Sequence, residues 1–363
     1  MVLTRGDDYP IHQTPEPIAY AGTDRNFYDR YFFNGYHARE GELFFSVAFG
    51  VYPHLNIADA AFCVTLDGVQ TALHASRWLN MERMALAVGP ITIDVEEPLQ
   101  RLRVRVEAPE QGLRADLTFE GRSFPIEEPR FMRRLGPRAF MDYTRLTQNG
   151  RWRGWIERDC RREVVDGYVG TRDRSWGVRP VGARDPQEIV PPVAPQFFWL
   201  WGPANFESGA YYFHTNDDGY GRPWNRREVW APDGGEVQEG EDFAVDVTWK
   251  AGTRHATRAV IRGPGDQTVI YEPEHVFFML GLGYGHPKWG HGLNHGELAV
   301  EREDLTAAEV DVRLPHHLHV QAISRVTYRS GGREQVGRGV LEQLVLGPHA
   351  PSGFSGMLDM AAA

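Results

Sequence analysis

The stretch RLRVRVEAPEQGLRADLTFEG, residues 101–121, shows the pattern that decides the fold. Charged and apolar residues alternate in 101–109 and again in 113–121, and a Pro- and Gly-containing turn separates the two runs. Strict alternation is typical of a strand with one face in the core and the other in solvent. Residues 243–252, FAVDVTWKAG, repeat it. We therefore predict an all-β protein built from antiparallel strands in a barrel or sandwich.

Turn signals support this class. Clusters such as NDDGYGRP, APDGGE and GPGD interrupt the alternating runs. The stretch 326–347 predicts a hairpin with Gly331 and Gly332 at its turn. Helical patterns are sparse: residues 71–86 mix helical and strand character, and 303–312 predict at most a short turn.

The chain is long enough for two β domains. It has 363 residues, and 181–196 contain four prolines with little periodicity, which suits a link between domains. We predict an N-terminal domain over 1–185, a C-terminal domain over 186–348 and a flexible tail over 349–363.

Composition narrows the class of partner and the compartment. The net charge of −10, without a long basic run, argues against nucleic acid as a partner. Cys63 and Cys160 are too few for a disulfide framework or a thiolate zinc site. The first residues lack the apolar core of a signal peptide, and no apolar run is long enough for a membrane span. We expect a cytoplasmic protein; the oligomeric state stays open.

The stretch GTRDRSWGVRP, residues 170–180, is too specific for plain scaffold. Asp173 lies among Arg172, Arg174 and Arg179, and neighbouring arginines normally keep an aspartate ionised with a lowered pKa. The stretch is either a structural anchor or part of a pocket. A pocket is an alternative because the forked guanidinium group of arginine also binds carboxylates. Ser175 and Trp176 complete it, and we expect Asp173 and Trp176 to point inward.

Two further stretches carry candidate polar groups. YFFNGYH, residues 31–37, places Asn34, Tyr36 and His37 beside aromatic residues; the alternative is a turn after an aromatic strand. In GRGVLEQLVLG, residues 337–347, Glu342 interrupts an otherwise apolar run. A buried glutamate needs a partner or stays protonated, and Arg172 or Arg174 could supply that partner; alternatively the side chain faces outward.

Histidines gather in the second half of the chain. Residues 281–303 contain His286, His291, His295 and Trp289 among glycines, which predicts a folded loop. Three histidines could hold zinc with one open position, but the loop could equally line a pocket mouth or lie in solvent. For His316, His317 and His319 we expect surface positions.

Three stretches together resemble a known family. GTRDRSWGVRP is similar to the Arg-Asp-His-Ser-Trp-Gly signature of the carotenoid 1,2-hydratase (hydroxyneurosporene synthase) and AttH-like proteins, and 31–37 and 283–292 resemble matching stretches of bacterial relatives. The resemblance implies two tandem lipocalin-like antiparallel β-barrel or sandwich domains of the calycin superfamily. It also implies cofactor-free chemistry, because members hydrate or cyclise isoprenoid chains or guide pericyclic ring closures. One position departs: Arg174 stands where the family has histidine, and arginine does not exchange a proton.

Three functions remain. The first is a cofactor-independent hydratase, cyclase or isomerase that acts on a hydrophobic isoprenoid, steroid-like or aromatic molecule by acid–base catalysis in an apolar pocket. Its predicted catalytic residues are Asp173, Glu342, His291, Tyr36 and His37. Its predicted substrate-binding residues are Asn34, Arg172, Arg174, Ser175, Trp176, His286, Trp289 and His295. The second is a lipocalin-like carrier of a hydrophobic ligand without turnover, and the third is a metal enzyme that uses His286, His291 and His295.

Overall fold

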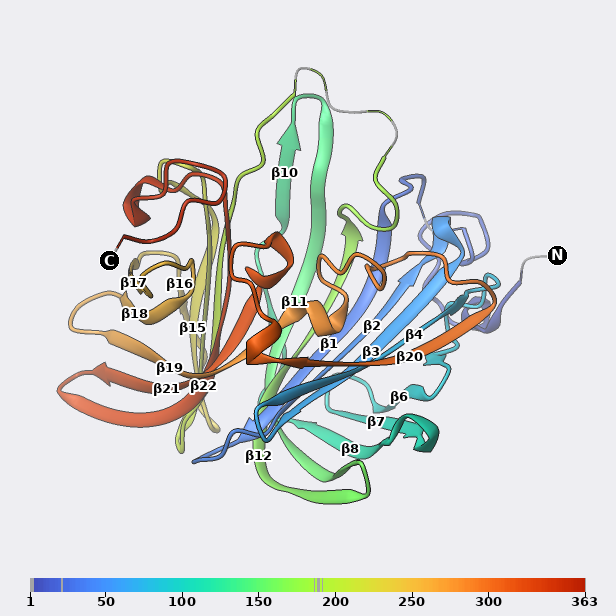
Figure 1. Ribbon diagram of the computed structural model, residues 1–363, viewed down its shortest axis with the longest axis horizontal. Coiled ribbons are helices and arrows are strands. Elements are labelled where there is room, and N and C mark those ends of the chain that lie inside the picture. Colours follow the sequence, from blue (N-terminus) through green and yellow to red (C-terminus); the bar gives the residue numbers. More distant parts are fainter. Residues whose placement is uncertain (1–2, 21, 186, 188–189, 191, 363) are drawn as a thin grey trace.

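The computed structural model describes residues 3–20, 22–185, 187, 190 and 192–362. Two antiparallel sheets lie side by side (Figure 1). In the described part of the chain the only helical elements are 3-10 turns, and none is long and apolar enough to cross a membrane. The prediction of an all-β chain with two tandem barrel-type units is confirmed.

The first sheet has 13 strands. They are β1 (Phe27–His37), β2 (Phe44–Tyr52), β3 (Ile57–Leu66), β4 (Val69–Trp78), β5 (Ala87–Val88), β6 (Ile91–Glu97), β7 (Arg101–Ala108), β8 (Leu113–Gly121), β9 (Ile126–Glu127), β10 (Phe131–Leu135), β11 (Arg138–Arg158), β12 (Arg161–Val178) and β20 (Leu298–Thr306). Their order is β20-β4-β3-β2-β1-β12-β11-β8-β7-β6-β5, with β9 and β10 paired to β11. The sheet curls into a nearly closed barrel, with β20 and β5 at its two edges.

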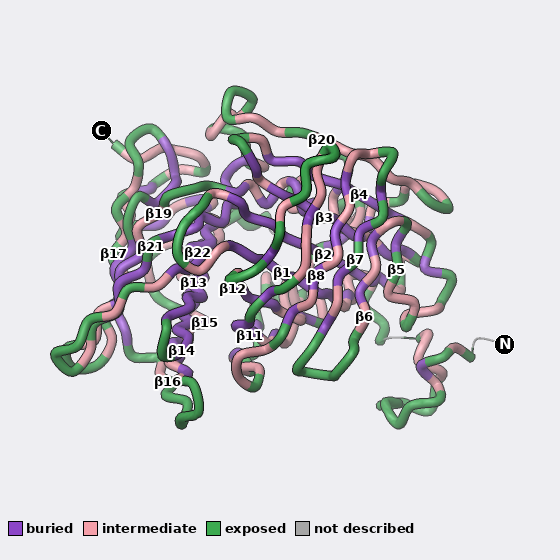
Figure 2. The backbone as a smooth tube through the Cα atoms, turned by 90° about the horizontal axis from the view of Figure 1, so that it is seen from below, coloured by how far each residue is buried: buried purple, intermediate pink, exposed green. Residues whose placement is uncertain are grey.

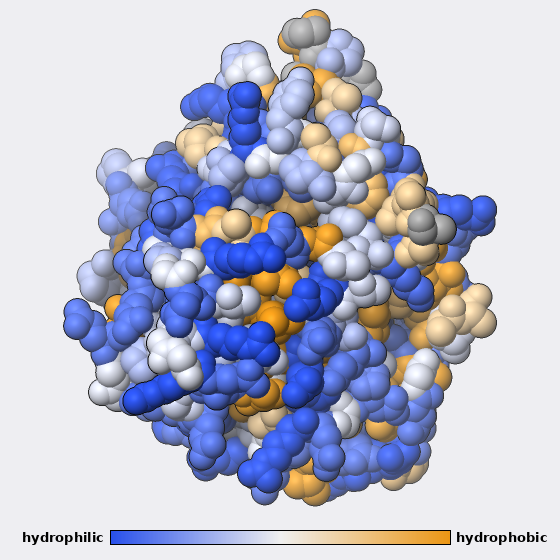
Figure 3. Space-filling model, turned by 90° about the vertical axis from the view of Figure 1, so that its left-hand side faces the viewer, coloured by the Kyte–Doolittle hydropathy of each residue, from blue (hydrophilic) through white to orange (hydrophobic). Residues whose placement is uncertain are grey.

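The second sheet has nine strands in the order β16-β15-β14-β13-β22-β21-β19-β18-β17. They are β13 (Phe197–Asn205), β14 (Gly209–Asp217), β15 (Pro223–Pro232), β16 (Gln238–Gly240), β17 (Ala244–Trp249), β18 (Ala256–Arg262), β19 (Thr268–Phe278), β21 (Val320–Ser330) and β22 (Arg333–Leu346). This sheet curls into a half-barrel. On the face of the molecule that carries it, hydrophobic residues show between hydrophilic ones (Figure 3).

Short 3-10 turns connect several strands. They are η1 (Arg5–Asp8), η2 (Pro53–Leu55), η3 (Pro109–Gln111), η4 (Met279–Leu282), η5 (Ala307–Glu309), η6 (Pro315–His317) and η7 (Ala350–Ser352). The predicted hairpin is confirmed: β21 pairs with β22, and Gly331 and Gly332 form the turn with φ of 58° and 72°. Such positive values favour glycine.

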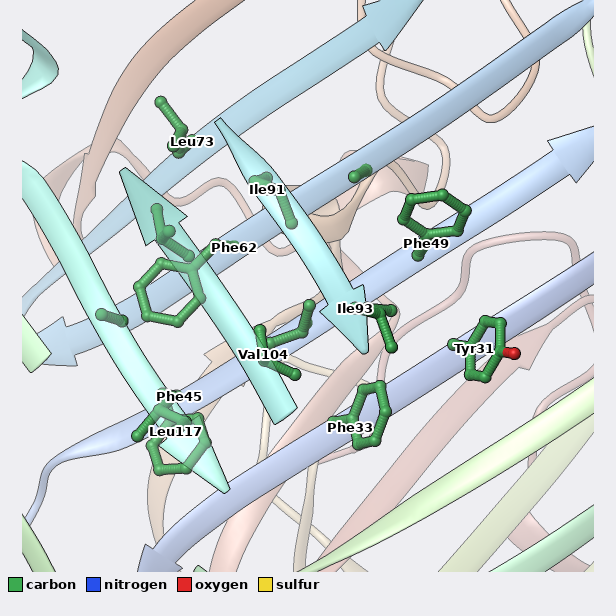
Figure 4. Packing of buried hydrophobic residues seen from close by; sticks show 14 of the residues in the cluster. Tyr31, Phe33, Phe45, Phe49, Phe62, Leu73, Ile91, Ile93, Val104 and Leu117 are labelled. Carbon is green, nitrogen blue, oxygen red and sulfur yellow. The ribbon is translucent and has the colours of Figure 1, made fainter. Parts of the chain in front are cut away.

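The three largest hydrophobic cores follow from the two faces of each sheet. The first lies inside the barrel, where β6–β8 cross over β1–β4 and enclose side chains such as Phe33, Phe62, Ile93 and Val104 (Figure 4). The second lies between the sheets and is rich in aromatic residues, including Phe32, Trp199 and Trp201. The third fills the curl of the second sheet. Buried residues accordingly run along the middle of the strands, and exposed ones gather in the turns (Figure 2).

The two halves of the chain are joined by more than the link. β12 ends at Val178 and β13 begins at Phe197, so the predicted boundary at residue 185 falls between the sheets; residues 186, 188, 189 and 191 of the link lie outside the described residues. The chain then returns: the segment after η4 crosses onto the first sheet (Figure 1), and β20 pairs with β4 along its whole length.

The C-terminal stretch, for which we expect a flexible tail, makes contacts with the second half of the chain. The buried guanidinium of Arg254 donates hydrogen bonds to the carbonyls of Gly347 at 2.8 Å and Asp359 at 2.7 Å. Phe354 is 3% exposed and belongs to the third core. The mostly small residues of the tail gave no sign of these contacts, because Arg254 lies far away in the sequence.

Candidate functional site

A cleft of about 480 Å³ opens where the two sheets meet. Both sheets and the segment between η4 and β20 contribute to its walls. The lining residues are Phe140, Met141, Tyr143, Arg145, Arg179, Pro180, Val181, Gly182, Phe197, Trp199, Gly283, Tyr284, Gly285, His286, Gly290, His291, Leu293, His319, Glu342 and Leu344. Most of the wall is apolar or aromatic and the charged groups are few, which is typical of a small-molecule site.

Glu342 is the best-supported polar group of the cleft. One carboxylate oxygen accepts hydrogen bonds from Trp199 Nε1 at 2.9 Å and His319 Nε2 at 2.7 Å. The other accepts from Gln321 Nε2 at 2.6 Å. Burial alone would raise the pKa of Glu342, but these donors outweigh it and lower the pKa below its ordinary value. The partners differ from the expected Arg172 or Arg174, and the carboxyl group is held as an ion.

The Glu342 network continues into the first sheet. Gln321 accepts from Asn34 Nδ2 at 3.1 Å, and Asn34 Oδ1 accepts from the backbone N–H of Thr171 at 2.8 Å. Asn34 and Gln321 are both fully buried. Asn34 therefore supports the carboxylate from behind instead of contacting a ligand in the cleft.

Three aromatic rings pack together at one wall of the cleft. Tyr284 stands between His291 and His319, with ring centroids 4.6 Å apart on both sides and the rings nearly perpendicular. His291 Nε2 lies 2.8 Å from the carbonyl of Leu282 and donates to it. Burial lowers the pKa of His291 well below its ordinary value, so this histidine stays neutral. The structure thus brings two predicted candidates, His291 and Glu342, into one cleft.

Asp173 points toward the sheet junction, and its arginine neighbours do not. On β12 the side chains alternate, so Arg172 and Arg174 face the other side. Arg172 donates to Gln148 at 2.7 Å, and Arg174 pairs with Asp29 and stacks on Tyr31. The expected lowered pKa of Asp173 is wrong: burial raises it to about 6, although Arg145 and Arg30 act in the opposite direction. Strand alternation is the physical reason for this correction.

Ser175 and Trp176, the next two residues of β12, also lie on opposite faces of the strand. Ser175 is buried and stands opposite Arg30 of β1 and Arg145 of β11. Trp176 is 38% exposed, so the expectation that it points inward is wrong. The tryptophan follows Ser175 on the strand and takes the opposite face.

A buried ion pair lies behind the cleft. Arg145 Nε donates to Glu128 at 2.8 Å, and Glu128 also accepts from the hydroxyl of Thr147 at 2.5 Å. The guanidinium of Arg145 lies 4.7 Å from the ring centroid of Trp199. Arg145 therefore brings a compensated positive charge to the aromatic wall.

Tyr36 and His37 lie at the far end of β1 and do not reach the cleft. Tyr36 is fully buried, and its hydroxyl lies 3.4 Å from Asn205 Nδ2 and from the carbonyl of Arg338. His37 packs edge-on against Tyr168. The path from Arg30 to Tyr36 is about 20 Å along a strand.

The remaining histidines of the glycine-rich segment form a cluster of their own. Trp289 stacks between His74, at 5.4 Å, and His295, at 4.1 Å, while its Nε1 donates to Glu301. His286 Nε2 lies 2.7 Å from Glu303. Of the three histidines in the segment, only His286 and His291 line the cleft, so the structure does not bring His286, His291 and His295 together as one ligand set.

Among the described residues, His74, His286 and Glu303 place three potential ligand atoms within 4.8 Å of one another. The hydrogen bonds do not suit a metal ion. His286 Nδ1 accepts backbone N–H groups from Lys288 at 3.0 Å and Trp289 at 2.9 Å, so the proton of the neutral ring resides on Nε2. A metal-ligating nitrogen must be unprotonated. His74 and His286 instead lower the pKa of Glu303 to about 2.

The sequence did not point to several groups in and beside the cleft. His319 of the cleft and the nearby His317 are 7% and 4% exposed, so the expected surface positions are wrong for both. Tyr284 was hidden in a loop, and Arg145 in the unremarkable stretch TRLTQNG. One signal was available for Arg30: it shares strand parity with Tyr28, Phe32 and Asn34, which places a charge on an otherwise uncharged face.

Comparison with known proteins adds the fold and the family. The structure of CghA with Sch210972 has a TM-score of 0.51 at 12% identity and covers 89% of each chain. Kievitone hydratase from Nectria haematococca has a TM-score of 0.47 at 10% identity, over 87% of this chain and 88% of that one. No curated protein matches the sequence. The model of a family of unknown function, DUF8625, matches residues 3–355, and the chain belongs to that family.

Proposed function

We propose that the protein is a cofactor-independent enzyme that moves protons on a hydrophobic small molecule, as a hydro-lyase or an isomerase or cyclase. The observation that carries the proposal is the buried Glu342 carboxylate, hydrogen-bonded to His319 at 2.7 Å, in a mostly apolar and aromatic cleft. A carboxylate and an imidazole so paired form an acid–base unit. A mere hydrophobic carrier needs no such unit.

His319 and Glu342 take different roles in this proposal. Because Nε2 of His319 is bonded to Glu342, Nδ1 is the ring nitrogen that exchanges a proton with the substrate. Glu342 orients the ring and stabilises the imidazolium, as the carboxylate does in serine-hydrolase triads. His319 would protonate an alkene or carbonyl; water then adds at the resulting cation, or a neighbouring proton leaves.

The wall of the cleft suits a cationic intermediate. Trp199 and Tyr284 present aromatic faces, which stabilise positive charge. Asp173 is not one of the lining residues, but it points toward the same junction, and its pKa of about 6 lets it hold or release a proton near neutral pH. The resemblance to carotenoid hydratases points to isoprenoid substrates, and Arg174 in place of the family histidine sets this chain apart from carotenoid hydration itself.

Deuterium incorporation tests the proposal, because it marks any product of proton transfer whatever its structure. The protein is incubated in D₂O with geraniol, farnesol, β-ionone and progesterone, and the compounds are analysed by mass spectrometry against a protein-free blank. We expect deuterium or D₂O to be incorporated into at least one compound. Glu342→Gln and His319→Gln should each lower that rate by roughly 100-fold or more, because general acid–base catalysis contributes on this scale.

Glu228→Gln is the matched control. Glu228 is a buried glutamate of β15 that accepts from Tyr211 at 2.9 Å and lies on the other face of the second sheet. Its rate should equal that of the unaltered protein. Compounds that bind in the cleft and emerge without deuterium would instead favour the hydrophobic carrier.

A further inference from the structure

Buried hydrogen-bond donors beside the cleft lack acceptors. Arg30 is 1% exposed, and its Nε, Nη1 and Nη2 have no hydrogen-bond partner in the described part of the chain. The same holds for Nε and Nη2 of Arg179. Leaving such groups unpaired costs free energy, most of all for a charged group.

These donors converge on one place. The Arg30 guanidinium lies 4.5 Å from the ring centroid of Tyr284. The Arg179 guanidinium lies 4.4 Å from the ring of Tyr28 and 5.7 Å from that of Tyr284. Arg179 and Tyr284 both line the cleft. The unpaired donors therefore lie around Tyr284 at the cleft wall.

Other arginines of this region are compensated. Arg145 pairs with Glu128, and Arg174 with Asp29. Arg30 and Arg179 form no ion pair among the residues that the structure describes. Asp59 feels both of them electrostatically, but its oxygens are engaged by Tyr52 at 3.0 Å and by the N–H of Gly292 at 2.7 Å.

We propose that Arg30 and Arg179 bind the carboxylate of an apolar monocarboxylic acid whose body lies on Phe197, Trp199 and Leu344 of the cleft. This inference rests on the proposed function, since it names the class of substrate for the same site. The planar guanidinium donates in a fork that matches a carboxylate. A doubly charged phosphate fits less well, because Asp59 already places negative charge near both arginines and Asp173 places it near Arg30.

Calorimetric titration with three probes of one shape tests the site. The probes are 2-naphthoate, the neutral 2-naphthamide and 2-naphthyl phosphate. We expect 2-naphthoate to bind at least ten times more tightly than either of the others. Arg179→Gln and Arg30→Gln should remove the preference over the amide and leave amide binding unchanged. Arg325→Gln, at an exposed arginine of β21, removes one charge elsewhere and should keep the preference.

Each contrary result overturns the assignment. Equal binding of 2-naphthoate and 2-naphthamide would exclude the carboxylate site while the apolar cleft, and with it the proposed function, stands. Tighter binding of the phosphate would exclude a monocarboxylate. A preference for 2-naphthoate that survives Arg179→Gln would exclude the two arginines as the carboxylate site. Because Arg179 lies at the cleft surface, its variant tests the site even if Arg30→Gln does not fold. Absence of binding by all three probes would overturn the site as well.

Discussion

Three carboxyl groups near the cleft differ in the partners that stabilise their negative charge. Glu128 has the guanidinium of Arg145, and Glu342 has His319, Gln321 and Trp199. Asp173 has no such partner in the part of the chain that the structure describes, and the charges of Glu128 and Glu342 add to burial in raising its pKa to about 6. The pKa of Glu342 is lowered and that of Asp173 is raised, and two acids whose pKa values are pushed apart divide the roles of acid and base. The proton of this group therefore resides on Asp173 when the pH falls toward 6.

Removing Glu128 should destabilise the protein strongly. The Glu128→Ala variant leaves the guanidinium of Arg145 buried without a counter-charge, and loss of one partner of a buried pair costs about 3–5 kcal/mol. Urea unfolding followed by tryptophan fluorescence measures this loss. The double variant Glu128→Leu/Arg145→Met should be more stable than Glu128→Ala, because no charge is left unpaired. A loss below about 1 kcal/mol in Glu128→Ala would show that the pair does not stabilise the junction.

At the scale of elements, the segment between η4 and β20 forms one wall of the cleft. Hydrogen bonds to the first half of the chain help to hold it in place. The N–H of Gly292 donates to Asp59 at 2.7 Å, and the carbonyl of His291 accepts from the N–H of Gly182 at 2.7 Å. Because Tyr284 and His291 belong to this segment, Asp59 of β3 helps to position the cleft wall from the first sheet.

Asp59 should make stability depend on pH in an unusual direction. Burial raises its pKa from 3.8 to about 6. The folded state therefore binds this proton more tightly than the unfolded state, and this group's contribution to stability falls as the pH rises from about 4 to about 6. Asp59→Asn lacks that loss. Between pH 4 and pH 7, the free energy of unfolding of the variant should therefore rise relative to that of the unaltered protein by up to about 3 kcal/mol.

Urea unfolding of both proteins across this pH range measures the difference. Asp116→Asn serves as the control. The Arg103 side chain lowers the pKa of Asp116, so the pH dependence of the stability difference should have the opposite sign. A difference between Asp59→Asn and the unaltered protein that does not change with pH would refute the linkage.

Strands with local signals were predictable, and strands that depend on distant partners were not. Alternation in 101–109 and 113–121 gave β7 and β8 almost to the residue. Residues 303–312 predicted only a turn, yet β20 extends to Thr306, because this edge strand is fixed by pairing with β4. The site shows the same limit. Glu342 and Asp173 stood out as charges in special surroundings, whereas the groups around them, His319, Gln321 and Arg145, come together only through pairing of distant strands.

At the scale of the whole molecule, the two sheets share a core, and the second half of the chain adds a strand to the first sheet. The aromatic cluster between them contains residues of β1–β4 and of β13–β15. The buried pair Asn34–Gln321 spans the same junction. β20, contributed by the second half of the chain, completes an edge of the first sheet. The cleft lies at this junction, so its geometry depends on both halves at once.

The protein should consequently unfold in one step. Either sheet alone would expose the aromatic cluster, and the first would also lose β20 from the edge of β4. We expect coincident transitions in urea when tryptophan fluorescence and far-ultraviolet circular dichroism are followed together. Asn34→Ala leaves Gln321 without one partner at the junction and should lower the free energy of unfolding by about 1–3 kcal/mol while the transition stays single. Two separate transitions, or a loss in Asn34→Ala confined to one of them, would show that the halves fold independently and that the cleft assembles only when they dock.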